Sequence, residues 1–325
     1  MGTGMENGIM DVFGQPLTRF GLCCAGALLA GLVICGIRMK QGSKSYGDWI
    51  RFVLCVTGFS WLFARLMFSF AEWIMILLEG IFDLETGRDP LSVIYFWRGG
   101  YSLMGAVLGA VIGAITAEKW TGSERGTLAD SLAFGLPVAI LLERLAEIGT
   151  GLGQGRYVTA QWLIDTGLCP ELYGDYVQPV YLYEAVVAFI LLIVMLILSR
   201  KERRPGTLLE IFLLLFGLSQ VLMESLRADG HMVEHFVHIQ QVYAILFAVG
   251  VILRWCLRME RKPGRGVRTA VGWVIIFAAV GLAIWAEFGV DRWGKPLLAY
   301  GLMSLCLIVI GLTGFYFLKQ GDTDS

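Results

Sequence analysis

Long apolar runs separated by short polar connections make up most of the sequence. A helix rises about 1.5 Å per residue, so about 20 apolar residues cross the roughly 30 Å hydrocarbon core of a bilayer. The pattern therefore predicts an all-α polytopic membrane protein with about nine transmembrane helices. The predicted spans run approximately over residues 17–37, 52–80, 101–117, 128–148, 180–199, 207–225, 238–257, 269–288 and 296–318.

The composition excludes an ordinary soluble domain of this size. Of the 325 residues, 56% are hydrophobic and only 16% are charged, and the mean hydropathy is +0.67. Such an apolar excess is typical of chains that face lipid. The net charge of −1 gives no reason to expect a nucleic acid partner. The seven cysteines include no C-x-x-C pair, so neither a disulfide framework nor a cysteine zinc site is expected.

The basic residues alternate between the two sets of connections. One set, which includes the segments 38–51, 200–204 and 254–268, carries most of the Lys and Arg residues. Because basic connections stay in the cytoplasm, the pattern predicts an external N-terminus and a cytoplasmic C-terminus. The first apolar run has no basic segment before it and no A-x-A pattern after it, so we expect a retained helix.

The candidate chemistry begins with Arg144, which lies inside the apolar run 128–148 between Glu143 and Glu147. An arginine at this depth costs roughly 2.5–3.5 kcal/mol on insertion scales unless it meets a partner or water. Arg227 follows another apolar run at the same predicted membrane face. A guanidinium can fork onto two phosphate oxygens, so the pair suits a phospholipid head group. A local ion pair with Glu147 and simple interfacial anchoring are the alternatives.

Two further polar features stand out. Arg65 lies within the run 52–80, where Glu72, a carboxylate on another helix, or snorkelling to the interface would accommodate its charge. The connection 149–178 is long for a helical bundle and rich in Gly, Asp, Tyr and Trp, so we expect it to form a cap or lid rather than a linker.

Four segments on the predicted outer face, taken in order, resemble the bacterial prolipoprotein diacylglyceryl transferase family. The family shows a W-x-G-G segment, a G-R-x-G-N-F segment, an H-P-x-Q-L-Y-E segment and an E-x-x-R-x-x-D segment. The resemblance covers roughly residues 10–258, which predicts a transferase-like domain at 1–258 and two additional helices at 259–325. The corresponding segments are Trp97-Arg98-Gly99-Gly100, Glu143-Arg144-Leu145-Ala146-Glu147, Pro179-Val180-Tyr181-Leu182-Tyr183-Glu184 and Glu224-Ser225-Leu226-Arg227-Ala228-Asp229.

The resemblance implies an activity and a set of site residues. The reaction would move the diacylglyceryl group of phosphatidylglycerol to the cysteine of a secreted lipoprotein precursor, in the bacterial inner membrane and without a cofactor or metal. Arg144, Arg227 and Glu147 would be catalytic, with the two cations on the phosphate and the carboxylate as a base for the thiol. The expected substrate-binding residues are Gly99, Gly100, Arg65, Tyr183, Glu184 and Glu224.

The sequence also departs from the family pattern, which keeps other functions open. Met104 takes the place of a histidine, and Glu147 takes the place of an asparagine. A lipid-binding or assembly-partner protein without catalysis would fit these changes. His231, Glu234 and His235 also form an H-x-x-E-H pattern, with His238 on the same face if the segment is helical. That pattern occurs in zinc proteases, so a membrane metalloprotease is a third hypothesis.

Overall fold

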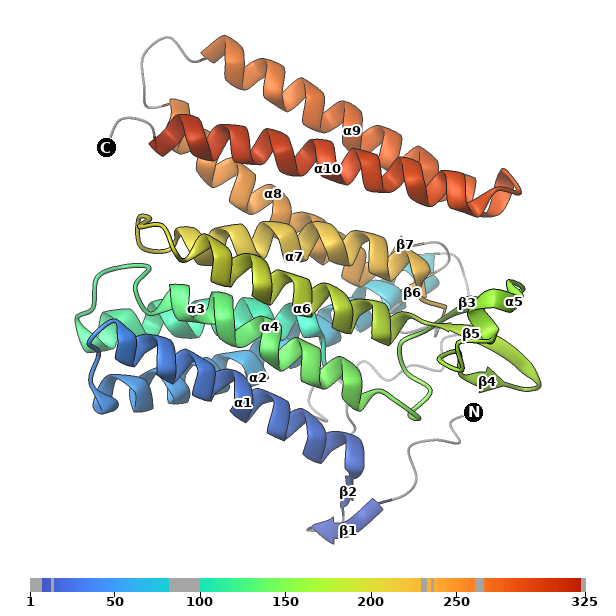
Figure 1. Cartoon of the computed structure of the whole chain (residues 1–325), viewed down its shortest axis with the longest axis horizontal. Coiled ribbons are helices and arrows are strands. Elements are labelled where there is room, and N and C mark those ends of the chain that lie inside the picture. The colour runs from blue at the N-terminus through green and yellow to red at the C-terminus, as the bar shows by residue number, and fades with distance from the viewer. Residues whose placement is uncertain are drawn as a thin grey trace. The chain divides into compact units, whose positions relative to one another are not determined.

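The structure of the chain is a computed structural model, and it describes residues 8–12, 15–81, 100–228, 233–234, 237–260 and 266–322. Within this part of the chain, nine long helices correspond to the nine predicted spans, which confirms the all-α polytopic fold (Figure 1). The helices are α1 Arg19–Gln41, α2 Tyr46–Ile81, α3 Leu103–Thr121, α4 Ala129–Ala146, α6 Val180–Leu198, α7 Thr207–Leu226, α8 Ile239–Glu260, α9 Gly266–Arg292 and α10 Pro296–Asp322.

Eight of the helices in the described ranges are long and apolar enough to cross a membrane. The remaining long helix is α4, which has 18 residues and carries Asp130, Glu143 and Arg144. At about 1.5 Å per residue its length is still close to the thickness of the hydrocarbon core. The charges on α4, rather than its length, therefore distinguish it from the others.

The chain divides into two compact units, and the division cuts α7 twice. Most of α7 belongs to the second unit, whereas its two ends and the residues that follow it belong to the first. The first unit comprises residues 1–209 and 226–240, and the second comprises 210–225 and 241–325. The predicted boundary at residue 258 rests on the family resemblance rather than on compactness, and it stays a prediction.

Glycines on α3 allow the close packing of α2 and α3 in the first unit. Gly105, Gly109 and Gly113 lie four residues apart on one face of α3, and each faces the backbone of α2. A Cβ at position 113 would lie 2.7 Å from the carbonyl oxygen of Cys55. Small residues at this spacing let two membrane helices approach closely and gain van der Waals contact.

Carboxylates on neighbouring elements cap the beginnings of α4 and α7. The N-cap residue of α4, Leu128, offers no side-chain cap. The Glu118 carboxylate accepts hydrogen bonds from the backbone N–H groups of Gly126, Leu128 and Ala129, at 2.9–3.0 Å. Asp130 in turn accepts from Gly206 and Leu209 at the start of α7. These bonds satisfy donors that a helix start leaves unpaired, and they fix the end of α4 that lies away from Arg144.

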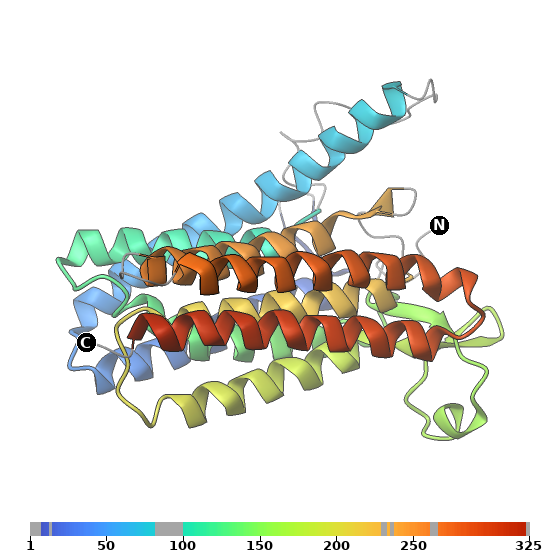
Figure 2. The same cartoon turned by 90° about the horizontal axis from the view of Figure 1, so that it is seen from above.

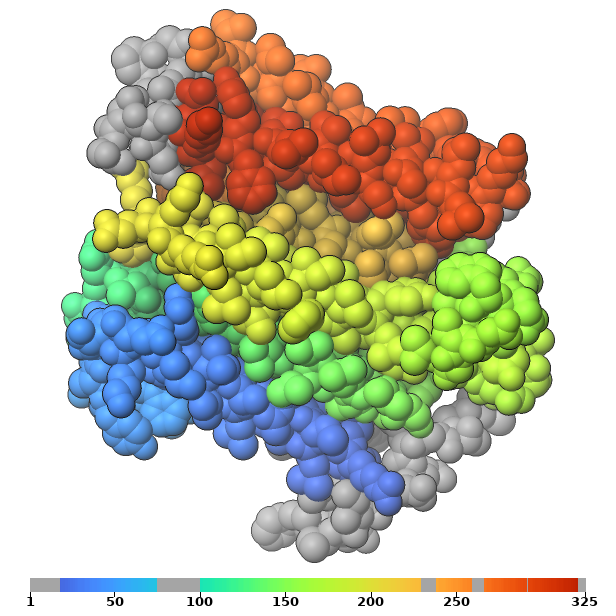
Figure 3. Space-filling model, viewed as in Figure 1, coloured from blue at the N-terminus to red at the C-terminus, as the bar shows by residue number. Residues whose placement is uncertain are grey.

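The predicted cap at 149–178 contains a small antiparallel sheet and the short helix α5 (Gln161–Ile164). The strands are β3 Gln154–Tyr157, β4 Glu171–Leu172 and β5 Asp175–Pro179, in the order β3-β5-β4. The space-filling view shows this segment gathered at the end of the helices of the first unit (Figure 3). Its role as a lid stays a prediction.

The turn between β4 and β5 explains why the sequence did not predict this sheet. Tyr173 and Gly174 are its two central residues, and both have positive φ, 53° and 91°. Two such residues form a type I′ turn, for which Asn-Gly is the usual sequence signal. Tyr-Gly is not a usual sequence signal for this turn. In addition, β3 pairs with β5 across some twenty residues, and local sequence does not indicate such a distant pairing.

In the second unit, α9 and α10 run side by side (Figures 1 and 2). Ser225, at the end of α7, donates its hydroxyl to the Glu287 carboxylate of α9 at 2.8 Å. The Tyr300 hydroxyl of α10 donates to the carbonyl oxygen of Ser225 at 3.3 Å. The two C-terminal helices therefore hold the end of α7 within this unit.

At the other end of α7, the buried Glu210 carboxylate joins this helix to α8. It accepts a hydrogen bond from the indole of Trp255 at 2.7 Å, and it pairs with Arg254 and Arg258 at 2.6 and 2.8 Å. Because hydrogen bonds and two cations satisfy the carboxylate, its burial carries no unpaired charge. We assign this cluster a structural role.

Candidate active site

The site begins at the end of α4, where Arg144 lies in the last helical turn. Its side chain is buried, and the residue is only 4% exposed. The guanidinium forms an ion pair with Glu147 on the same helix face, and its Nε lies 3.3 Å from Glu143 Oε2. The predicted local ion pair therefore exists, although it is only part of the surroundings of Arg144.

The second element is α6, which brings Glu184 to Arg144. Glu184 is 1% exposed, and its Oε2 lies 2.9 Å from Nε of Arg144. Strand β5 runs directly into α6, and the Tyr181 N–H donates to the carbonyl oxygen of Gly153 at 2.9 Å. The cap therefore fixes the beginning of the helix that carries Glu184.

Arg227 comes from a third element, the extended residues that follow α7. Its Nη1 lies 3.6 Å from Glu184 Oε2, the same oxygen that Arg144 contacts. The backbone of Arg227 pairs with Gly155 of β3 as an isolated β-bridge, and the Ala228 N–H donates to the Gln154 carbonyl at 2.9 Å. The structure thus brings together the two arginines that the sequence singled out, and the cap holds the second of them.

Glu147 lies beside the cap as well as beside Arg144. It is buried, and it directly follows the last residue of α4. Gly153 has φ +64°, and a Cβ at this position would collide with Glu147 Oε2 and lie 2.8 Å from Cβ of Tyr181. Only glycine combines this backbone conformation with so close an approach. The cap therefore packs directly against the Glu147 carboxylate.

The charges of this cluster are dense and almost balanced. Three carboxyl groups, from Glu143, Glu147 and Glu184, surround two guanidinium groups, so full ionisation gives 2 − 3 = −1. Taking five ionisable groups out of water is expensive, and apolar residues would stabilise the helices at least as well. Ionisable groups buried in membrane helices usually mark a functional site, which makes this cluster the candidate site.

Arg65 and Gly100 form a second polar cluster in the first unit. Arg65 Nη1 donates to the carbonyl oxygen of Gly100 at 2.8 Å, and its guanidinium lies 5.6 Å from the centre of the Phe68 ring and 6.0 Å from that of Tyr101. Gly100 has φ +80°, and a Cβ there would collide with Phe68. The structure thus pairs two of the predicted substrate-binding residues. Gly99 lies outside the described residues.

Three other predicted positions are placed as follows. Tyr183 lies half-buried in the first turns of α6, one residue before Glu184. Glu224 is buried near the end of α7, and it belongs to the second unit. Met104, which stands where the family pattern has a histidine, is fully buried near the start of α3. A buried thioether offers no proton, so Met104 cannot supply acid–base chemistry.

The described residues of the histidine segment do not form the helix that a zinc protease pattern requires. The described residues on either side of His235 form two short strands, β6 Val233–Glu234 and β7 Val237–His238. In the H-x-x-E-H pattern both histidines lie on one helical face. No group of three potential metal ligands occurs among the described residues. His231 and His235 themselves lie outside them.

The sequence predicts a cap at 149–178, but not which site residues it contacts. Gly153 touches Glu147, and Gly155 pairs with the backbone of Arg227. The alternating glycines of Gly151-Leu152-Gly153-Gln154-Gly155 were a usable signal, because glycine in a strand indicates a close backbone approach. Glu143 is next to Arg144 in the sequence, and this position alone does not predict its contact with the guanidinium.

Comparisons of the sequence with known proteins identify the family of this chain. The family model of prolipoprotein diacylglyceryl transferase matches residues 8–285. The phosphatidylglycerol–prolipoprotein diacylglyceryl transferase of Halalkalibacterium halodurans is 26% identical over 254 residues, which cover 74% of this chain and 82% of that protein. The protein of the same name from Clostridium novyi is also 26% identical over 254 residues, which cover 75% of this chain and 92% of that protein. The chain therefore belongs to the prolipoprotein diacylglyceryl transferase family.

Proposed function

We propose that this protein transfers the diacylglyceryl group of phosphatidylglycerol to the cysteine thiol of a secreted lipoprotein precursor. The relatives carry this activity in their names, and the family match covers most of the chain. One observation supports placing this reaction at the α4–α6 cluster: Arg144 and Arg227 both contact the same carboxylate oxygen of Glu184. Two buried cations at one point form a clamp for an anionic head group.

The arginines hold the phosphate of the donor lipid in this proposal. A guanidinium has five N–H donors, so one group can bind a carboxylate and a phosphate oxygen together. Glu184 and Glu147 orient the two guanidinium groups before the lipid enters. As the bond between the glycerol carbon and the phosphate oxygen breaks, negative charge develops on the leaving phosphate. Fixed cations in a site that excludes water stabilise that charge strongly.

Glu147 is the proposed general base. The thiol gives its proton to the Glu147 carboxylate, and the sulfur attacks the glycerol carbon of the diacylglyceryl group. The new carbon–sulfur bond forms while the carbon–oxygen bond to the phosphate breaks. Its electron pair leaves with glycerol-1-phosphate, so the reaction needs no oxidant or cofactor. The position of Glu147 beside Arg144 and under Gly153 supports this role.

The distribution of basic residues among the connections supports placing this chemistry at the outer face of the membrane. The apolar helices make the chain a multi-pass membrane protein, and its relatives are bacterial. With an external N-terminus, the end of α4 and the cap lie at the outer face of the inner membrane. A secreted precursor and the head groups of the outer leaflet meet at this level.

A direct transfer assay tests the function. Purified full-length protein is mixed with phosphatidylglycerol vesicles and a peptide that contains a lipobox cysteine. The products are identified by mass spectrometry. We expect a thioether-linked diacylglyceryl peptide and an equal amount of glycerol-1-phosphate. A peptide with serine in place of the cysteine is the control. Lipid binding without product from folded protein would favour the non-catalytic hypothesis, to which the buried Met104 also points.

The substitution Gly155→Ala tests the role of the cap in placing Arg227. The new Cβ would lie 2.7 Å from Val180 Cγ2 and 2.8 Å from the Leu226 carbonyl oxygen, so β3 must shift away from the Arg227 backbone. A displacement of about 1 Å at a catalytic group can cost up to about 10²-fold in rate. We expect transfer to fall by about 10- to 100-fold.

The matched control for this prediction is Gly26→Ala. A Cβ at position 26 meets nothing within 4 Å, so the added methyl group should leave transfer unchanged. Both variants are first compared with the wild type by thermal unfolding in detergent. Wild-type transfer rates in a folded Gly155→Ala protein would show that the bridge to Arg227 does not position the cation.

A further inference from the structure

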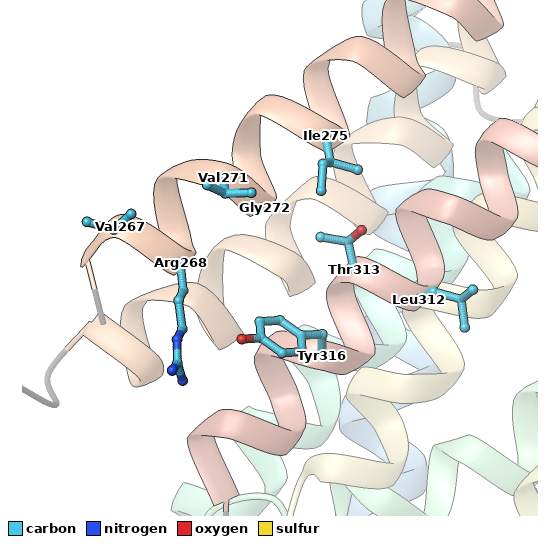
Figure 4. Close-up of a pocket in the computed structure, with 8 residues that line it drawn as sticks. All are labelled: Val267, Arg268, Val271, Gly272, Ile275, Leu312, Thr313 and Tyr316. Carbon is cyan, nitrogen blue, oxygen red and sulfur yellow. The ribbon is translucent and has the colours of Figure 1, made fainter. Parts of the chain in front are cut away.

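A groove runs along the α9–α10 pair in the second unit. Its volume is about 450 Å³, and its walls come from both helices (Figure 4). Val271, Ile275 and Leu312 contribute aliphatic side chains to its lining. The lining residues are Val267, Arg268, Val271, Gly272, Ile275, Leu312, Thr313 and Tyr316.

Away from Arg268 and Tyr316, the lining of the groove is apolar apart from Thr313, whose hydroxyl is occupied. Gly272 has no side chain, and a Cβ there would collide with the Phe317 ring, which packs against this part of α9. The Thr313 hydroxyl donates to the Val309 carbonyl of its own helix at 2.8 Å. From Arg268 to Ile275 the groove follows α9 for two turns, about 10 Å.

One end of the groove is cationic. Arg268 lies exposed in the first turn of α9, and in Figure 4 its side chain and that of Tyr316 lie at the same end of the groove. Within the described residues, no carboxylate lies within ion-pair distance of Arg268. The start of α9 adds the positive end of its helix dipole. The sequence also places Arg261, Lys262 and Arg265 just before this helix.

We infer that this groove binds one anionic phospholipid of the surrounding leaflet, with an acyl chain along Val271 and Ile275 and the phosphate at Arg268. The candidate spans of α9 and α10 cover residues 266–290 and 296–320, so Arg268 and Tyr316 lie near one boundary of the hydrocarbon. Arginine and tyrosine are the side chains that meet lipid head groups at this depth.

The charge and exposure of the groove favour a lipid over a second protein chain. Val271 and Leu312 are 53% and 64% exposed, as expected for side chains that face acyl chains. A symmetric second copy would bring its own Arg268 to the same end and repel the first. The groove lies in the second unit, while the proposed transfer site lies in the first, so this inference does not depend on the proposed function.

Photolabelling in nanodiscs tests the inference. Full-length protein is embedded in phosphatidylcholine that contains a small fraction of phosphatidylserine with a diazirine in one acyl chain, and labelled peptides are identified by mass spectrometry. Phosphatidylserine is anionic but has no glycerol head group. We expect labelling in residues 266–275 and 312–316, and about tenfold weaker labelling by the matching phosphatidylcholine probe.

Three variants decide the outcome. Arg268→Gln should remove the preference for the anionic probe, and Leu312→Trp should reduce labelling by both probes because it fills the groove. Lys295→Gln, at the other end of the same helix pair, should change neither. Equal labelling by the two probes in the wild type would overturn the inference. So would undiminished labelling of Arg268→Gln, or a groove that a second copy shields from both probes.

Discussion

Arg144→Gln should lower kcat/KM for diacylglyceryl transfer by about 10³-fold. Loss of one preorganised donor to a developing oxyanion costs about 10²–10³ in rate, and Arg144 supplies a full positive charge as well. The substitution also leaves three buried carboxyl groups with one guanidinium, so their formal charge changes from −1 to 1 − 3 = −2. An uncompensated buried charge destabilises a protein by about 3–5 kcal/mol. Loss of folding must therefore be separated from loss of chemistry.

The double variant Arg144→Gln/Glu184→Gln makes this separation. It restores the formal charge of the cluster to 1 − 2 = −1, the wild-type value, so we expect thermal unfolding close to that of the wild type. Its transfer rate should stay as low as that of Arg144→Gln. Recovery of transfer in the double variant would mean that Arg144 only neutralises its neighbours. Arg200→Gln, an exposed arginine after α6, controls for the loss of a positive charge.

The helices could be predicted from the sequence because a membrane helix depends on local composition. A helix needs an apolar run of about 20 residues to cross the hydrocarbon core, and such runs can be read directly from the sequence. The ends of the nine long helices lie within a few residues of most predicted limits. The longest run, 52–80, became the single helix α2 of 36 residues. The largest difference is at α2, which begins at Tyr46, six residues before the predicted limit of 52.

The site was predicted only in part because its contacts are tertiary. Local spacing predicted the pair of Arg144 with Glu147, three residues away on one helical face. The contact of Arg144 with Glu184 joins residues forty positions apart on different helices, and periodicity carries no information about it. Only the family resemblance placed Glu184 in the site. The sheet of the cap, which holds Arg227, depends on the Tyr173-Gly174 turn and on pairing across the whole loop.

The two arginines of the cluster share one carboxylate partner, Glu184. Glu184 Oε2 contacts both cations, so a change at one arginine alters the orientation of the other through the shared carboxylate. Residues that share one partner generally show non-additive effects. The two arginines should therefore act as one unit in the transition state rather than as two independent charges.

Arg227→Gln should lower kcat/KM by about 10²-fold, and the double variant Arg144→Gln/Arg227→Gln should lose far less than the product of the single effects. Once the first guanidinium is gone, the phosphate is no longer held at the point where the second could stabilise it, so the second loss costs little more. Catalytic groups that act as a unit show this behaviour. The measurement is kcat/KM for phosphatidylglycerol in the wild type, both single variants and the double variant. Arg292→Gln, at the end of α9, serves as the control. Single effects that multiply to about 10⁵-fold would mean that the two cations act on separate events, because a shared head-group clamp requires their losses to overlap.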